Sequence, residues 1–213
     1  MEKEINRSAK KLLTMLLLFV VFQAASIVFY GFDYGFDLAW TAECLILLAA
    51  GILMYNSYRN HTKNVMKPVL GATLALVMYY NMDIAMDYIQ YLKSIFEAAP
   101  GNVACVVYTI SQIMVFVVLA LMNIMHYSIN STHHSSPKKI KFNKFLYVLF
   151  VIFSIANCVA FFYTTYGINL KISCAVGNIA DFFLVSMVIS VESLLDEFRL
   201  EREAKAESEA AEA

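Results

Sequence analysis

Long runs of apolar residues, each about the length of a membrane-spanning helix, dominate the chain. A bilayer core about 30 Å thick needs roughly 17–25 mostly apolar residues in helical form. We place such spans at residues 12–32, 38–58, 68–92, 102–127, 145–170 and 172–196. Apolar residues surround each of these predicted helices on all sides. The pattern predicts an all-α fold: a polytopic integral membrane bundle of six transmembrane helices, arranged as three hairpins.

The composition supports a membrane protein over a soluble one. Of the 213 residues, 60% are hydrophobic and 15% are charged. An average soluble domain is about 45–50% apolar and about 25% charged. One core of this size cannot bury the excess, which excludes a soluble enzyme. The net charge of −1 offers no basic surface for nucleic acid, so the expected partner is the lipid bilayer.

The positive charges define an orientation. All Lys and Arg residues except Lys93 and Lys171 lie before the first span, in the second-to-third and fourth-to-fifth connections, or after the last span. Because cytoplasmic loops carry the excess of Lys and Arg, both termini are predicted to be cytoplasmic. The expected organisation is a cytoplasmic N-terminus (1–11), a membrane domain (12–196) and a charged helical tail (197–213), in the inner membrane of a bacterium.

The ionisable residues inside the spans are all acidic. They are Glu43, Asp83, Asp87 and Asp181, and no Lys or Arg lies within a span to pair with them. An ionisable group in the hydrocarbon costs several kcal/mol and marks a functional site by default. The amides Gln112, Asn157 and Asn178 fall in the same outer half of the bundle as these acids.

The third span carries the most informative pattern. Tyr80, Asp83, Asp87 and Tyr91 are spaced so that they share one stripe of a helix. Two carboxylates one turn apart repel, so one is protonated or both share a cation. Tyrosines can donate hydrogen bonds to a carboxylate or present ring faces to an organic cation. We therefore expect an outward-facing pocket for a small cationic or amine-bearing ligand. Its candidate binding residues are Asp83, Asp87, Tyr80, Tyr91, Glu43, Asp181, Asn178 and Gln112.

Two alternatives need no ligand. The acids could hydrogen-bond to Gln112, Asn157 and Asn178 across helices and hold the bundle together. Asp87 and Glu43 could also simply reach the outer headgroup region.

No catalytic chemistry is visible in the sequence. Cys44, Cys105, Cys158 and Cys174 form no Cys-x-x-Cys pair and are interpreted as small apolar residues. The histidines, among them His126, lie at or beyond the cytoplasmic ends of the spans, which disfavours a haem. Phosphate-binding loops, zinc-protease helices and nucleophile elbows are absent from the sequence. No catalytic residue, metal or cofactor is predicted.

The sixth span continues into a charged helix-forming segment without a Gly or Pro stop. Its sequence, VESLLDEFRLEREAKAESEAAEA, keeps an apolar seam at Val191, Leu194, Leu195 and Phe198. The 192–213 helix is expected to dock a cytoplasmic partner, the alternative being a frayed, solvated tail. Few glycines and prolines interrupt the spans, which favours a compact bundle over a self-contained carrier or channel.

Six spans with short outer loops, followed by EREAKAESEAAEA, resemble the membrane input regions of bacterial sensor histidine kinases and diguanylate cyclases. The resemblance implies a ligand sensor that signals through its sixth helix to a cytoplasmic signalling partner. The chain is also similar to the substrate-binding S-component of energy-coupling-factor vitamin transporters, which are six-span proteins of about this length that bind ligand towards the outer face. That resemblance implies a transporter subunit for a vitamin- or ion-type solute, with an ATPase partner. A homodimer is left open.

Overall fold

The computed structural model consists of six long helices. They are α1 (Glu2–Tyr34), α2 (Leu38–Arg59), α3 (Lys63–Ala98), α4 (Val103–Ser131), α5 (Pro137–Phe162) and α6 (Ile168–Glu212). The structure describes the backbone of residues 2–59, 63–98, 103–131, 137–163 and 167–212, and it describes side chains at 10–38, 41–57, 67–82, 85–86, 103–128, 138–163 and 167–192. No strand occurs in these backbone ranges, which confirms the predicted all-α class.

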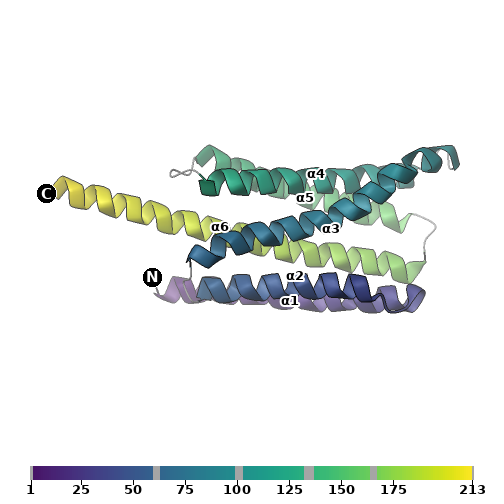
Figure 1. Ribbon diagram of the computed structural model, residues 1–213, viewed down its shortest axis with the longest axis horizontal. Helices are drawn as coiled ribbons and strands as arrows, with labels where there is room; N and C mark the ends of the chain where they lie inside the picture. Colours follow the sequence, from purple (N-terminus) through teal and green to yellow (C-terminus); the bar gives the residue numbers. More distant parts are fainter. Residues whose placement is uncertain (1, 60–62, 99–102, 132–136, 164–166, 213) are drawn as a thin grey trace.

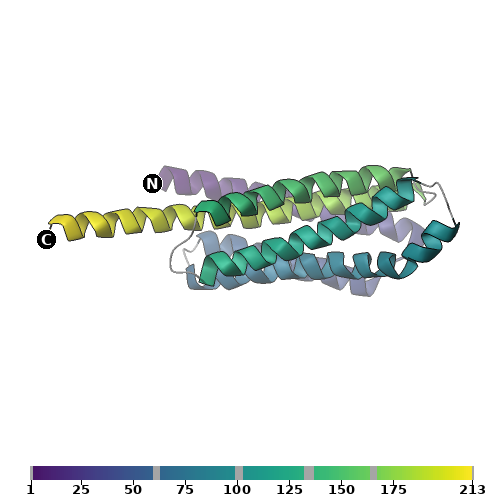
Figure 2. The ribbon, with the colours of Figure 1, turned by 90° about the horizontal axis from the view of Figure 1, so that it is seen from above.

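Successive helices run antiparallel along one common direction (Figures 1 and 2). We call the end where α1 begins the proximal end, and the end where α1 turns into α2 the distal end. α6 runs from the distal to the proximal end and then projects beyond the other helices (Figure 1). The most extensive packing joins α1 to α6, and α4 to both α5 and α3. α6 contacts α5 and α3 less extensively, so it lies between an α1 side and an α3–α4–α5 side.

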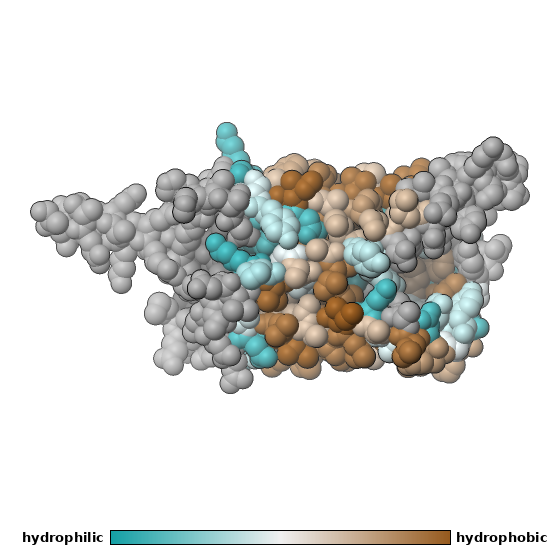
Figure 3. Space-filling view, viewed as in Figure 1, coloured by the Kyte–Doolittle hydropathy of each residue, from teal (hydrophilic) through white to brown (hydrophobic). Residues whose placement is uncertain are grey.

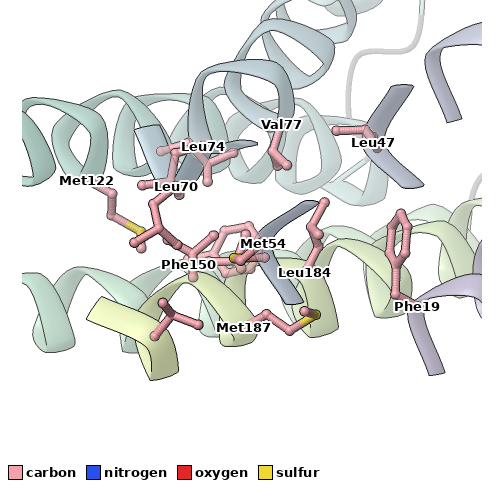
Figure 4. Packing of buried hydrophobic residues seen from close by; sticks show 14 of the residues in the cluster. Phe19, Leu47, Met54, Leu70, Leu74, Val77, Met122, Phe150, Leu184 and Met187 are labelled. Atoms are coloured by element: carbon pink, nitrogen blue, oxygen red, sulfur yellow. The ribbon is translucent and has the colours of Figure 1, made fainter. Parts of the chain in front are cut away.

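One apolar core receives side chains from every helix (Figure 4). Phe19, Met54, Leu70, Met122, Phe150 and Leu184 come from α1 to α6 in order, and each is fully buried. Flexible methionines fill irregular gaps between rigid rings and branched side chains. The six helices therefore form a single packing unit.

The outside of the bundle is apolar as well. A stripe along α5, made of Phe145, Val148, Ile152, Ile155, Val159 and Phe162, is more than 40% exposed at each position. Figure 3 shows hydrophobic side chains around the middle of the molecule. So much exposed apolar surface is unfavourable in water and suits contact with lipid.

Four segments are long and apolar enough to cross a membrane: Lys10–Tyr34, Val103–Ser128, Lys138–Phe162 and Ile168–Glu192. α2 contributes a shorter apolar segment, Thr41–Ser57. These segments suggest a membrane protein.

The turn between α5 and α6 lies earlier in the sequence than predicted. We expected the fifth span to reach residue 170 and the sixth to begin at 172, but α5 ends at Phe162 and α6 begins at Ile168. The Lys171 N–H already donates to the Gly167 carbonyl at 3.1 Å, which closes the first turn of α6. The expected span ran through residues 163–167, Tyr-Thr-Thr-Tyr-Gly, because they carry no charge, although Gly167 marks the turn.

A carboxylate from α1 caps the start of α6. Asp33 accepts hydrogen bonds from the Asn169 side chain at 2.9 Å and from the Leu170 backbone N–H at 3.2 Å. A Cβ on Gly167 would lie only 2.9 Å from the Asp33 carboxylate, so glycine permits this close approach. A negative charge satisfies the free N–H groups at a helix N-terminus and complements its dipole. The cap ties the distal ends of α1 and α6 together.

Asp33→Ala should destabilise the bundle by about 1 kcal/mol, the usual cost of losing a helix N-cap. Thermal unfolding in detergent micelles would measure the loss. Asp33→Asn keeps a side-chain acceptor and should lose less. Equal unfolding temperatures for the alanine variant and the parent would contradict the capping role.

Candidate functional site

Asp181 places a carboxyl group inside the bundle, midway along the apolar part of α6. It is 7% exposed and is flanked by the partly buried Phe182 and the fully buried Leu184. The Asn81 side chain of α3 lies beside the carboxyl, close enough to influence it. The thiol of Cys44 on α2 is close enough to interact with it electrostatically. No Lys or Arg occurs along α6 between Lys171 and Arg199, so the helix brings no cation of its own.

A chain of amide side chains crosses four helices beside this acid. Gln112 on α4 donates to the Asn81 Oδ1 on α3 at 3.3 Å. Asn157 on α5 donates to the Gln112 Oε1 at 2.9 Å. Asn178 on α6 donates to the Asn157 Oδ1 at 3.4 Å. Because Asn81 reaches both Gln112 and Asp181, the acid and the amides form one polar cluster, which we call the amide–acid cluster.

The predicted site residues divide into those the structure brings together and those it does not describe. Asp181, Asn178 and Gln112 belong to the amide–acid cluster. Tyr80 and Glu43 are half-buried, on α3 and α2. Asp83, Asp87 and Tyr91 lie on α3, but their side chains are outside the described residues, so their joint pocket stays a prediction.

We considered that the polar residues bond across helices and need no ligand. Gln112 and Asn178 do so in part. Both do hydrogen-bond across helices, although the partners shown are other amides rather than the acids we expected. Lipid cannot hydrogen-bond to amide side chains. The bonds among the buried amides therefore determine which helix faces meet. The cluster thus has a structural role whether or not a ligand binds beside it.

A second buried polar cluster lies near the proximal end. The His126 Nδ1 on α4 is 2.6 Å from the Glu192 Oε1 on α6. Asn143 on α5 donates to the other carboxylate oxygen, Oε2, at 2.7 Å. All three side chains are less than 10% exposed. We call this the latch cluster, and it joins three helices through a single carboxyl group.

The latch cluster was not predicted from the sequence, in which His126 lies at the end of a predicted span and Glu192 begins the charged 192–213 segment. A usable signal was present, because Glu192 follows Asp181 by 11 residues, close to three full helical turns. That spacing puts the two acids on the same side of α6.

Comparisons with known proteins find no matching family model, no matching curated protein and no matching solved structure. The class of the protein therefore follows from its own features: an all-helical bundle with membrane-compatible helices and two buried polar clusters. Among the residues whose side chains are described, no group of three or more His, Cys, Asp or Glu could hold a metal ion. The amide–acid cluster instead offers one buried carboxyl group beside a chain of neutral amides.

Gln112→Leu should destabilise the bundle by about 1–2 kcal/mol, because it removes two interhelical hydrogen bonds worth up to about 1 kcal/mol each. It leaves the Asn81 and Asn157 amides without these partners. Ile110→Leu, on the exposed side of the same helix, is the control and should be near neutral. Thermal unfolding in detergent compares the two. If Gln112→Leu unfolds at the temperature of the control, the amides do not hold the helices together.

Proposed function

We propose that all six helices cross the inner membrane of a bacterium, with both termini in the cytoplasm. The antiparallel order supports this topology, because α1 begins and α6 ends at the same end of the bundle (Figure 1). The exposed lysines Lys10, Lys11, Lys67, Lys138 and Lys141 all lie near the proximal end, which the positive-inside rule assigns to the cytoplasm. The distal end then faces the outside.

We further propose that the protein is a membrane sensor without catalytic activity. It binds a small cationic or amine-bearing ligand from the distal side and signals through α6. The observation that carries the proposal is that Asp181 and the projecting tail belong to one uninterrupted helix of 45 residues. A change in how Asp181 is paired therefore acts directly on the element that leaves the membrane.

The chemistry of the cluster favours a cation over an anion. A buried carboxyl without a basic neighbour is costly unless it is neutral or paired. A ligand cation supplies the missing charge, and the oxygens of Asn81 and Asn157 are acceptors for its N–H groups. Asp83, Asp87, Tyr80, Tyr91 and Glu43 complete the proposed entrance from the distal side.

Asp181→Asn should abolish stabilisation by cations. The probes are sodium, potassium, choline and spermidine chlorides, added to the purified protein in detergent while its thermal unfolding is followed. At 100 times its dissociation constant, a bound ligand stabilises the folded state by about 2.7 kcal/mol. At least one probe should stabilise the parent protein and not Asp181→Asn.

The matched control is Asp37→Asn, which removes an exposed carboxylate from the α1–α2 turn at the distal end. It should keep the response of the parent. Binding at Asp181 is contradicted if no probe stabilises the parent, or if Asp181→Asn responds as the parent does.

The predicted acidic stripe has its own test. Asp83→Asn combined with Asp87→Asn should abolish the cation response while membrane insertion stays intact. Failure of the double variant to insert would show that these acids hold the bundle together. A response equal to that of the parent would remove both acids from the ligand site.

Co-purification from native membranes distinguishes the sensor from the transporter subunit. A tag on the N-terminus leaves the 192–213 helix free to bind its partner. A kinase, cyclase or response regulator would support the sensor. ATPase subunits would favour the substrate-binding subunit of a transporter. The sensor is preferred because α6 links the acid to the tail without a break.

A further inference from the structure

α6 is held by contacts to two sides of the bundle. On the α1 side, Ser26 and Ser173 exchange hydrogen bonds with each other's backbone carbonyls at 2.8 Å, and Phe22 stacks on Phe183. Together with the Asp33 cap, these contacts bind the distal half of α6 to α1. A Cβ on Gly177 would lie 3.1 Å from the Ser26 Oγ, which shows how closely the two helices approach.

On the side facing α3, α4 and α5, α6 contributes fully buried side chains to the apolar core and stacks Phe182 on Tyr147. Polar links on this side are spread along the helix. Asn178 bonds to Asn157 near the middle of the apolar segment, and Ser186 bonds to Tyr147 at 2.6 Å further towards the proximal end. Glu192 bonds to His126 and Asn143 near the proximal end. The packing of α6 on α5 and α3 is also less extensive than its packing on α1.

The Glu192 link differs from the other two in its position. The apolar part of α6 ends at Glu192. The C-terminal part of α6 projects beyond the other helices (Figure 1). A buried amide deep in hydrocarbon has no alternative partner, so breaking its bonds costs the full desolvation penalty. A carboxylate at the membrane edge exchanges its protein partners for water when it moves outward. Breaking the Glu192 hydrogen bonds therefore costs less free energy than breaking those of Asn178.

On the side away from Glu192, the His126 imidazole packs against the α3 backbone at Gly71. A Cβ on Gly71 of α3 would lie 3.2 Å from the His126 Nε2 and 3.5 Å from the Tyr127 hydroxyl. Glycine at this position lets the α3 backbone press against the ring. The ring is then held between α3 and the Glu192 carboxyl, so α3 is also part of the arrangement.

We propose that the latch cluster is a conformational latch. With His126, Asn143 and Glu192 bonded, it holds the proximal part of α6 against α3, α4 and α5. When these bonds break, the proximal part of α6 separates from those helices while its distal half stays on α1. The inference rests on the proposed function, in which α6 carries the signal to the cytoplasm. Its test requires no ligand.

Amide hydrogen exchange of the full chain in lipid nanodiscs tests the latch. His126→Leu removes the partner of the Glu192 Oε1 and should raise exchange in the segment around residues 189–200 by about tenfold, as expected for losing one hydrogen bond to a charged group. The segment 168–184 should keep the exchange of the parent. His126→Asn places an amide donor near the position of Nδ1 and should stay close to the parent.

A second variant avoids removing any polar group. Gly71→Ala forces the imidazole to shift by a few tenths of an ångström, and it should raise exchange in the same segment, by less than His126→Leu. The latch is refuted if His126→Leu leaves segment 189–200 unchanged. It is also refuted if exchange rises equally in segment 168–184, because that result indicates general destabilisation. Neither result depends on cation binding at Asp181, so the two proposals fail separately.

Discussion

Polar side chains buried in an apolar bundle must find partners inside the protein, because neither the core nor lipid can supply them. The rest of this structure depends on that constraint. The amides of Asn81, Gln112, Asn157 and Asn178 bond to one another across four helices, and Glu192 bonds to the His126 ring and the Asn143 Nδ2 across three. The apolar contacts fill the space between helices, but lipid is equally apolar on the outside. The polar contacts therefore determine which helix faces meet.

α6 takes part in both polar clusters and also extends beyond the bundle. It is fixed to α1 at its distal end by the Asp33 cap and the paired serines. Along its other face it carries Asn178, Asp181, Ser186 and Glu192, which are directed at polar partners. The distal half of α6 is held on α1, and its proximal part is held against the other helices by the apolar core and by the Glu192 bonds. One continuous helix therefore links the proposed cation site at Asp181 to the proposed latch at Glu192.

The helical class could be predicted from sequence because hydropathy and span length depend on local composition. The break before Ile168 was missed because residues 163–167 are uncharged and were counted into the span, while the cap that fixes the start of α6 comes from a distant helix. Asp181, Gln112 and Asn178 were found because polar residues in an apolar span stand out. His126 and Glu192 were overlooked because each lies at a span end, where charge is ordinary. Their pairing depends on the rotation of α4 and α6, which packing determines and sequence does not state.

The central claim is that occupation of the Asp181 site moves α6 relative to α3, α4 and α5. It is tested most directly by the distance between two spin labels in lipid nanodiscs, one at Lys138→Cys on α5 and one at Ala204→Cys on the projecting part of α6. The native cysteines are replaced by alanine beforehand. We predict that the distance distribution shifts in at least one of sodium, potassium, choline or spermidine buffer, and that Asp181→Asn removes the shift. A cation that binds at Asp181 and leaves the distribution unchanged would contradict the account.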